Sequence, residues 1–196
     1  MNNYEYIIAG LPLLRQSDTQ PLDTDGILAE IRSQLSEKDR ATLDCLLASY
    51  DPEQLTPEFY RAADEKQRNR FLKEFFRMDL GVRNAKVGFL NRTLGRPEGT
   101  DIVIPDPEKE TPEFAQKNEV DAILAESDIL ARERALDDFY WKNVDDMTVM
   151  DVFNLDVILA FVVKLKLVER WLRLDEQTGR ELFRKLVKEI KDNTEI

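Results

Sequence analysis

The most apolar stretch of the chain, residues 149–174 (VMDVFNLDVILAFVVKLKLVERWLRL), constrains the fold more than any other feature. Its longest uncharged run is residues 157–163, well short of the roughly 20 apolar residues that a bilayer-spanning helix needs. Crossing a bilayer would also bring Asp156, Lys164 and Lys166 into hydrocarbon, at about 2.5–3.5 kcal/mol for each central charge. The stretch therefore predicts no membrane insertion, but a helix that other protein must cover.

Within this stretch, large apolar residues recur at intervals of three and four, which places them on one helical face. These residues are Leu155, Ile158, Leu159, Val162, Leu165, Val168 and Leu172. Val157, Phe161 and Val163 fall elsewhere around the same helix, so it is apolar nearly all round for two turns. Such a helix must be covered on several sides. We expect a central helix of a bundle, and an interface with another subunit stays open as the alternative.

Helix starts are marked by the tetrapeptide Thr-Pro-Glu-Phe, which occurs at residues 56–59 and again at 111–114. Threonine accepts a hydrogen bond from a free backbone N–H, proline lacks only an idle donor, and glutamate meets the positive end of the helix dipole. Ser36 ahead of an apolar run is a looser version of this signal. No βαβ rhythm appears, so the class is mainly α, a bundle of seven to eight helices. The expected helices lie near residues 24–33, 37–49, 57–77, 80–94, 112–125, 128–143, 149–173 and 176–191.

Residues 4–12 (YEYIIAGLP) suit a short strand or a helical turn ended by Gly10 and Pro12, and we expect a short N-terminal extended segment. The whole chain, residues 1–196, is expected to form one helical domain. The proline- and glycine-rich connection at residues 95–112 is the candidate subdomain boundary.

Two segments echo each other and raise the possibility of two helical pseudo-repeats. Residues 70–76 (RFLKEFF) resemble residues 134–140 (RALDDFY), and a Met-Asp step follows each, at 78–79 and 150–151. The internal spacings differ, so a chance match of common helical residues is the alternative.

The chain carries a formal net charge of −11, but its charges are unevenly distributed. Residues 61–96 hold ten basic and four acidic residues, a charge of +6, which leaves −17 for the rest of the chain. This asymmetry predicts contact between the basic segment and an acidic surface of a partner. The candidate partner-binding residues are Arg68, Arg70, Lys73, Arg77 and Arg83. A nucleic-acid-binding role for the same segment is the alternative, although the acidity of the chain opposes it.

The usual signatures of chemistry are missing from the sequence. There is no histidine, which removes the commonest general base and metal ligand, and no phosphate-binding glycine-rich loop. The single cysteine, Cys45, excludes an internal disulfide. The sequence therefore predicts no catalytic residues, no cofactor, no metal and no small-molecule substrate. The first six residues (MNNYEY) lack the layout of a secretory signal, so we expect a cytoplasmic protein.

Both ends of the chain carry a resemblance. Residues 4–12 and residues 160–171 (AFVVKLKLVERW), followed by Leu174, Asp175 and Gly179, resemble an uncharacterised family of bacterial proteins encoded among V-type ATPase genes. More loosely, residues 78–80 (MDL) with Asn84 and Arg92 resemble the Asp…Asn…Arg helix-start pattern of the all-helical central-stalk socket protein of V-type ATPases. A second copy of that pattern, at residues 151–154, has a different gap and no matching arginine.

This resemblance implies a non-catalytic subunit or assembly factor of a rotary V-type ATPase, with a central-stalk coupling element similar to the socket protein as the finer version. The expected partners are V-type ATPase subunits, and such a complex would place the protein at the membrane periphery. A protein of this kind works by rigid shape and matched charge, so its function would lie in the apolar helix and in the basic segment.

Overall fold

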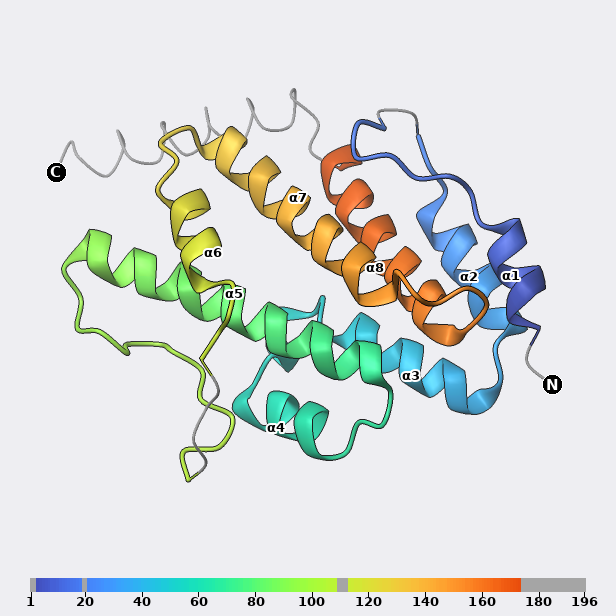
Figure 1. Cartoon of the computed structure of the whole chain (residues 1–196), viewed down its shortest axis with the longest axis horizontal. Helices are drawn as coiled ribbons and strands as arrows, with labels where there is room; N and C mark the ends of the chain where they lie inside the picture. The colour runs from blue at the N-terminus through green and yellow to red at the C-terminus, as the bar shows by residue number, and fades with distance from the viewer. Residues whose placement is uncertain (1–2, 19–20, 109–112, 174–196) are drawn as a thin grey trace, which may run out of the picture.

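The computed structural model describes residues 3–18, 21–108 and 113–173, and this part of the chain folds into helices with no strand (Figure 1). It contains eight α-helices and one short 3₁₀ helix at Pro52–Gln54. The α-helices are α1 Tyr4–Gly10, α2 Thr24–Gln34, α3 Glu37–Ala48, α4 Pro57–Glu65, α5 Arg70–Leu94, α6 Lys117–Leu124, α7 Ile129–Thr148 and α8 Leu155–Leu172. The predicted class, a mainly α bundle of seven to eight helices, is confirmed.

Helix α8 is the central element of the bundle. It packs against α1, α2, α3, α5 and α7, while α4 and α6 pack on the long α5 (Figure 1). Ile158, Leu159, Val162 and Leu165 of α8 are fully buried. The helices that cover α8 belong to the same chain, so the described residues explain its apolar character without a membrane or a second subunit.

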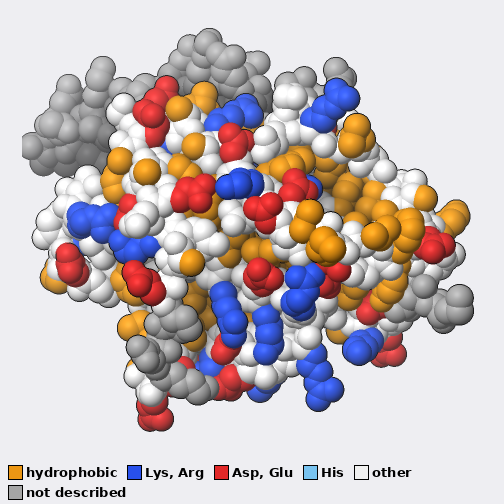
Figure 2. Space-filling view, in the orientation of Figure 1, with side chains coloured by type: hydrophobic (Ala, Val, Ile, Leu, Met, Phe, Trp, Pro, Cys, Tyr) orange, Lys and Arg blue, Asp and Glu red, His pale blue; other side chains and the backbone are white. Residues whose placement is uncertain are grey.

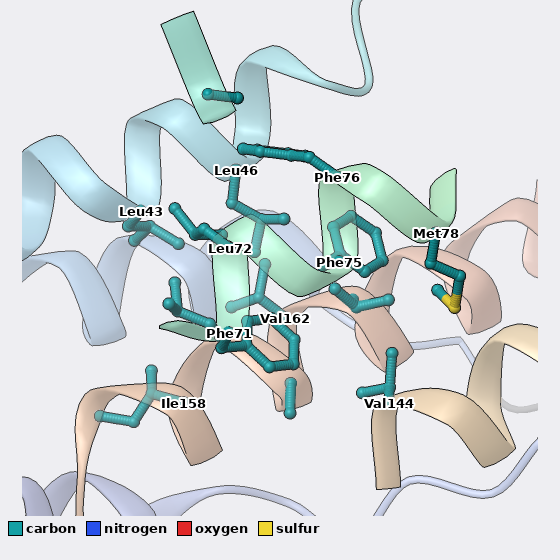
Figure 3. Packing of buried hydrophobic residues seen from close by; sticks show 14 of the residues in the cluster. Leu43, Leu46, Phe71, Leu72, Phe75, Phe76, Met78, Val144, Ile158 and Val162 are labelled. Atoms are coloured by element: carbon teal, nitrogen blue, oxygen red, sulfur yellow. The ribbon is translucent and has the colours of Figure 1, made fainter. Parts of the chain in front are cut away.

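The first two turns of α5 supply the aromatic part of the core. Phe71, Phe75 and Phe76 are 0–3% exposed, and the rings of Phe71 and Phe75 stack with centroids 5.9 Å apart. Leu43 of α3 and Ile158 of α8 belong to the same buried cluster (Figure 3). Phe75 and Phe76 follow Phe71 by four and five residues, which places all three on the buried side of α5, where they fill the space between α3, α7 and α8.

A buried carboxylate, Asp79, lies in the middle of α5, and both of its oxygens accept hydrogen bonds. Tyr60 and Tyr140 donate to it at 3.2 Å and 2.8 Å, and Arg83 donates through Nε at 2.6 Å. Burial first, and then the negative charge of Asp79, raises the pKa of both phenols above the ordinary value of 10.0. Both tyrosines therefore stay protonated donors at neutral pH, and the network joins α4, α5 and α7.

The helix predicted over 57–77 and the one predicted over 80–94 are divided differently in the structure. The break falls at residues 66–69, and α5 runs unbroken through the Met78-Asp79 step. Asn69 marks the true start, because its side chain accepts from the backbone N–H of Leu72 at 2.8 Å. The predicted break was wrong because Asp79 is satisfied through its side chain, by Tyr60 and Tyr140 from other helices and by Arg83 one turn along α5, while its backbone stays helical.

Four other expectations about helices are corrected or left untested. The N-terminal segment is helical rather than extended, because Tyr4, Ile7, Ile8 and Leu11 pack on the core at helical spacing. Helix α8 begins at Leu155 rather than at 149, since Asn154 caps it by accepting from Val157 N at 3.2 Å. The helix predicted near 112 begins at Lys117. The one predicted over 176–191 lies outside the described residues.

The two echoed segments occupy different structural positions. Residues 70–76 open α5, whereas residues 134–140 lie inside α7. The Met-Asp step at 78–79 is helical, whereas the step at 150–151 lies in the connection between α7 and α8. Placement in space therefore does not support paired repeats, and Asp79 does not stand at a helix start as the pattern of the socket protein would have it.

The predicted caps at Thr56 and Ser36 are confirmed. Thr56 accepts from Phe59 N at 3.2 Å, and Ser36 accepts from Asp39 N at 3.3 Å. In the part of the chain that the structure describes, no helix has the length and hydropathy needed to cross a membrane.

We predict that Glu169 makes the stability of the bundle depend on acid pH. Its buried carboxylate accepts from Thr24 of α2 at 2.7 Å, from Lys166 at 2.8 Å and from Arg173 at 2.6 Å. Burial acts to raise the pKa of Glu169, but the hydrogen bonds from Lys166 and Thr24 outweigh it, and the pKa lies below the ordinary 4.5. A lowered folded-state pKa means that this stabilisation is present above about pH 4.5 and is lost as pH falls through the folded-state value.

The matched comparison is Glu169→Gln, measured by urea unfolding from pH 3.5 to 7. At pH 7 the variant should be less stable by about 1–3 kcal/mol, because it loses charge-assisted hydrogen bonds. Its stability should fall less steeply than that of the wild type between pH 5 and 3.5. Parallel pH profiles for the two proteins would contradict the assignment.

Candidate partner-binding site

An open groove of about 1560 Å³ runs along α5 from its N-terminal half to Arg92. Helix α4 lines one side of it, residues 98–106 and 113–117 cross its far part, and Asn143, Asp146 and Met147 close the end nearest α7. Its apolar lining includes Phe76, Met78, Leu80 and Phe114. The groove combines apolar and charged side chains on one concave surface, so it is the candidate binding site.

The basic segment forms one border of this groove. Figure 2 shows Lys and Arg side chains gathered over α4 and the N-terminal half of α5. Four of the five predicted partner-binding residues line the groove, namely Arg68, Arg70, Lys73 and Arg77. The fifth, Arg83, is not among the residues that line it.

Arg70 holds the helix ends together. Its guanidinium donates to the backbone carbonyl of Met147 at 3.0 Å, to Asp151 at 2.6 Å and to Asp156 at 3.3 Å. Asn69 donates to the other oxygen of Asp156 at 2.5 Å. These contacts tie the start of α5 to the start of α8 and to the connection that precedes it, so Arg70 has a structural role.

Arg77 and Arg83 are also engaged within the molecule. Arg77 forms an ion pair with Asp64 of α4 at 2.5 Å, between side chains that are 65% and 46% exposed. Arg83 neutralises the buried Asp79 and also reaches the carbonyl of Ser49 at 3.4 Å. Exposed pairs such as Arg77–Asp64 contribute little to stability, whereas Arg83 compensates a charge that is 5% exposed.

Of the five predicted residues, Arg68 and Lys73 have no acidic partner within the described residues, whereas Arg70, Arg77 and Arg83 each have one. Arg68 is exposed, Lys73 is half-buried, and both line the groove. Cations that are not neutralised internally are the ones able to attract an acidic ligand. Among the five predicted residues, Arg68 and Lys73 are therefore the strongest candidates for contact with a partner.

The groove as a whole carries charges of both signs. Its basic lining residues are Arg61, Arg68, Arg70, Lys73, Arg77, Arg92 and Lys117. Its acidic lining residues are Asp64, Glu65, Glu74, Glu98, Asp106, Glu113, Asp121 and Asp146. With seven cations and eight anions, the groove is suited to a ligand that carries both charges and apolar groups, as a protein segment does.

The connection after α5 folds back along the groove and is attached to α5 by two asparagines. Asn84 donates to the carbonyl of Val103 at 2.9 Å and accepts from its N–H at 3.0 Å, and Asn91 donates to the carbonyl of Thr100 at 2.7 Å. Farther on, the ring of Phe114 lies directly against Gly81. A Cβ at position 81 would stand 2.5 Å from this ring, so only glycine allows so close an approach.

A second cluster of charges surrounds Asp137, outside the groove. Asp137 accepts from Trp171 at 2.5 Å and pairs with Arg170 at 3.2 Å, and burial raises its pKa. This cluster joins α7 to α8 and lines no groove, so we interpret it as structural. Within the described residues, no group of three or more His, Cys, Asp or Glu side chains is arranged to hold a metal ion.

Comparison with known proteins places the chain in a family. The model of the family described as Protein of unknown function (DUF2764) matches residues 52–194, which is most of the chain. The chain therefore belongs to this family, and the match includes the groove and α8. No curated protein and no solved structure matches it.

Sequence reasoning missed Phe114 as a contributor to this site, and it also missed the connection between α7 and α8, which Arg70 of the groove holds in place. The Thr-Pro-Glu-Phe pattern predicts Phe114 at a helix start, whereas the structure places it at Gly81 in the groove wall. The apolar composition of the connection predicts that it belongs to the following helix, although Asn154, a residue favoured at helix starts, marks where α8 begins.

We predict that the effect of Gly81→Ala on stability changes sign with residue 114. In the wild type the new methyl group must displace the Phe114 ring, and overpacking of this kind costs about 1–3 kcal/mol. In a Phe114→Ala background the space is free, and alanine should stabilise α5 by up to about 1 kcal/mol because it is the better helix former.

Urea unfolding of the four proteins in this double-mutant cycle measures the coupling. A coupling near zero, with Gly81→Ala stabilising in both backgrounds, would mean that Phe114 does not rest on Gly81.

Proposed function

We propose that this protein is a non-catalytic, protein-binding subunit or assembly factor of a rotary V-type ATPase. The sequence resemblance at both ends of the chain supports the ATPase assignment, and a coupling role in the central stalk is its finer form. The observation that carries the protein-binding role is the pair Arg68 and Lys73, two cations on the border of a mixed-charge groove that no carboxylate of residues 3–18, 21–108 or 113–173 neutralises.

The character of the groove favours a protein partner over nucleic acid. A nucleic-acid strand presents a phosphate at every step, so a groove with as many acidic as basic residues would repel it along much of its length. Single-stranded nucleic acid also needs aromatic faces on which bases can stack. Phe71, Phe75 and Phe76, the aromatic residues of the basic segment nearest Arg68 and Lys73, are buried in the core.

The scaffold behind the groove is built to keep its shape. Helix α5, which forms the floor, is fixed to α3, α7 and α8 by its aromatic face and to α4 by the Asp79 network. A rigid surface loses little conformational freedom on binding, which favours affinity for a partner of matching shape. This rigidity suits a subunit that transmits force or holds neighbouring subunits in fixed positions.

The test is coprecipitation from an extract of the cells that produce the protein, with ATPase subunits identified by mass spectrometry. The Arg68→Ala/Lys73→Ala double variant should retain about three- to tenfold less of these subunits at low salt, because it loses two charge contacts of up to about 1 kcal/mol each. The difference should shrink at high salt, where exposed charges are screened.

The matched control is Lys38→Ala/Lys142→Ala, which removes the same charge from two exposed lysines outside the groove. This control should bind like the wild type. Equal loss in both double variants would show a nonspecific charge effect, and unchanged binding in both would exclude the groove border as the contact. Recovery of DNA or RNA in place of ATPase subunits would favour the nucleic-acid alternative.

A further inference from the structure

The connection between α7 and α8 exposes four large apolar side chains within five residues. Val149 is 75% exposed, Met150 89%, Val152 65% and Phe153 51%. Figure 2 shows hydrophobic side chains concentrated over this connection and the neighbouring α1. Single exposed apolar residues are ordinary, but a continuous group on one loop marks a contact site.

This loop is held in place by polar contacts on its inner side. Asp151 accepts from Arg70 at 2.6 Å and from the side chain of Asn154 at 2.8 Å, and its backbone N–H donates to the carbonyl of Thr148 at 2.9 Å. The one charged residue of the loop thus faces the scaffold, while its apolar neighbours face outward. The exposed group is therefore preorganised for contact, which lowers the entropy cost of binding.

The loop also continues into the basic end of the groove. Arg70 joins them, since it lines the groove and holds both Asp151 and the carbonyl of Met147. Arg68 and Lys73 flank Arg70 along the chain and line the same end. One continuous surface thus pairs an apolar projection with two uncompensated cations.

We propose that the α7–α8 connection is the apolar half of a docking site for an acidic amphipathic helix of a partner protein. The apolar face of that helix covers Val149, Met150, Val152 and Phe153, and its carboxylates, spaced at three or four residues, reach Arg68 and Lys73. This inference rests on the proposed protein-binding role and adds the chemistry of the partner.

Charge argues against the other occupants. The C-terminal residues 174–196 hold five basic and six acidic residues, so they carry almost no net charge and match two cations less well than an acidic helix does. A two-fold contact with a second copy would place the same basic border against itself and bring no surplus of carboxylates to Arg68 and Lys73. A flat anionic membrane would meet the exposed acidic residues Glu74 and Asp146 beside the cations, whereas a helix can place its carboxylates opposite the cations alone.

The experiment places the photocrosslinker p-benzoylphenylalanine at Met150 in the full chain, expressed in the cells that produce the protein. The matched control places it at Ile129, which is 67% exposed at the start of α7. After irradiation, the crosslinked peptide is sequenced by mass spectrometry. Position 150 should capture a peptide of another protein with Asp or Glu at three- or four-residue spacing between apolar residues, and position 129 should not.

That peptide is then synthesised and titrated against variants whose substitutions lie on the surface, with circular dichroism as the folding control. Met150→Asp should weaken its binding tenfold or more, because it removes apolar contact and adds repulsion. Met150→Lys should weaken binding less than Met150→Asp, a charge signature that loss of apolar contact alone would not give. Arg68→Ala should weaken binding severalfold, and Ile129→Asp should leave it unchanged.

Capture of phospholipid, of this chain itself or of a basic segment at position 150 would overturn the proposal, as would capture no greater than at position 129. The proposed ATPase role and the docking site can be contradicted separately. Capture at position 150 of an acidic amphipathic helix from a protein that is not an ATPase subunit would contradict the proposed function but support the docking site. ATPase subunits that depend on Arg68 and Lys73 but never crosslink at 150 would contradict only the docking site.

Discussion

The fold depends on the burial of α8, whose apolar side chains must be covered by protein on every side. Its buried side chains, including Ile158, Leu159, Val162 and Leu165, each stabilise the fold by about 1.5–3 kcal/mol before chain entropy is subtracted. No single neighbouring helix covers such a surface, and α1, α2, α3, α5 and α7 share the task. The resulting bundle is a rigid scaffold, and α4, α6 and the connections lie on its outside.

Polar contacts at the ends of the helices then decide which charges remain for a partner. Arg70 and Arg83 are used to neutralise Asp156 and Asp79, two carboxylates that burial would otherwise make costly. Arg68 and Lys73 have no such task among the described residues. Most of the basic residues in 61–96 therefore stabilise the fold. Arg68 and Lys73 are left to meet a partner, beside the apolar loop that Arg70 holds.

Local signals predicted much of this fold. The caps at Thr56 and Ser36 and the apolar stripe of α8 depend on neighbours in the chain, and the structure confirms them. The unbroken α5 could not be predicted, because Asp79 is stabilised by residues up to 61 positions away. The same holds for the candidate site: the charge distribution pointed to residues 61–96, but Arg70 pairs with Asp151 across 81 positions, so the sequence could not show which of its cations are engaged within the fold.

Amide hydrogen exchange of the native protein tests the central claim most directly. If protein on every side covers α8, the amides of residues 158–168 should exchange most slowly, with opening free energies equal to the global free energy of unfolding. The exposed connection at residues 149–153 should exchange far faster. Exchange of residues 158–163 as fast as that connection would contradict the account, because it would show α8 accessible to water in the folded protein.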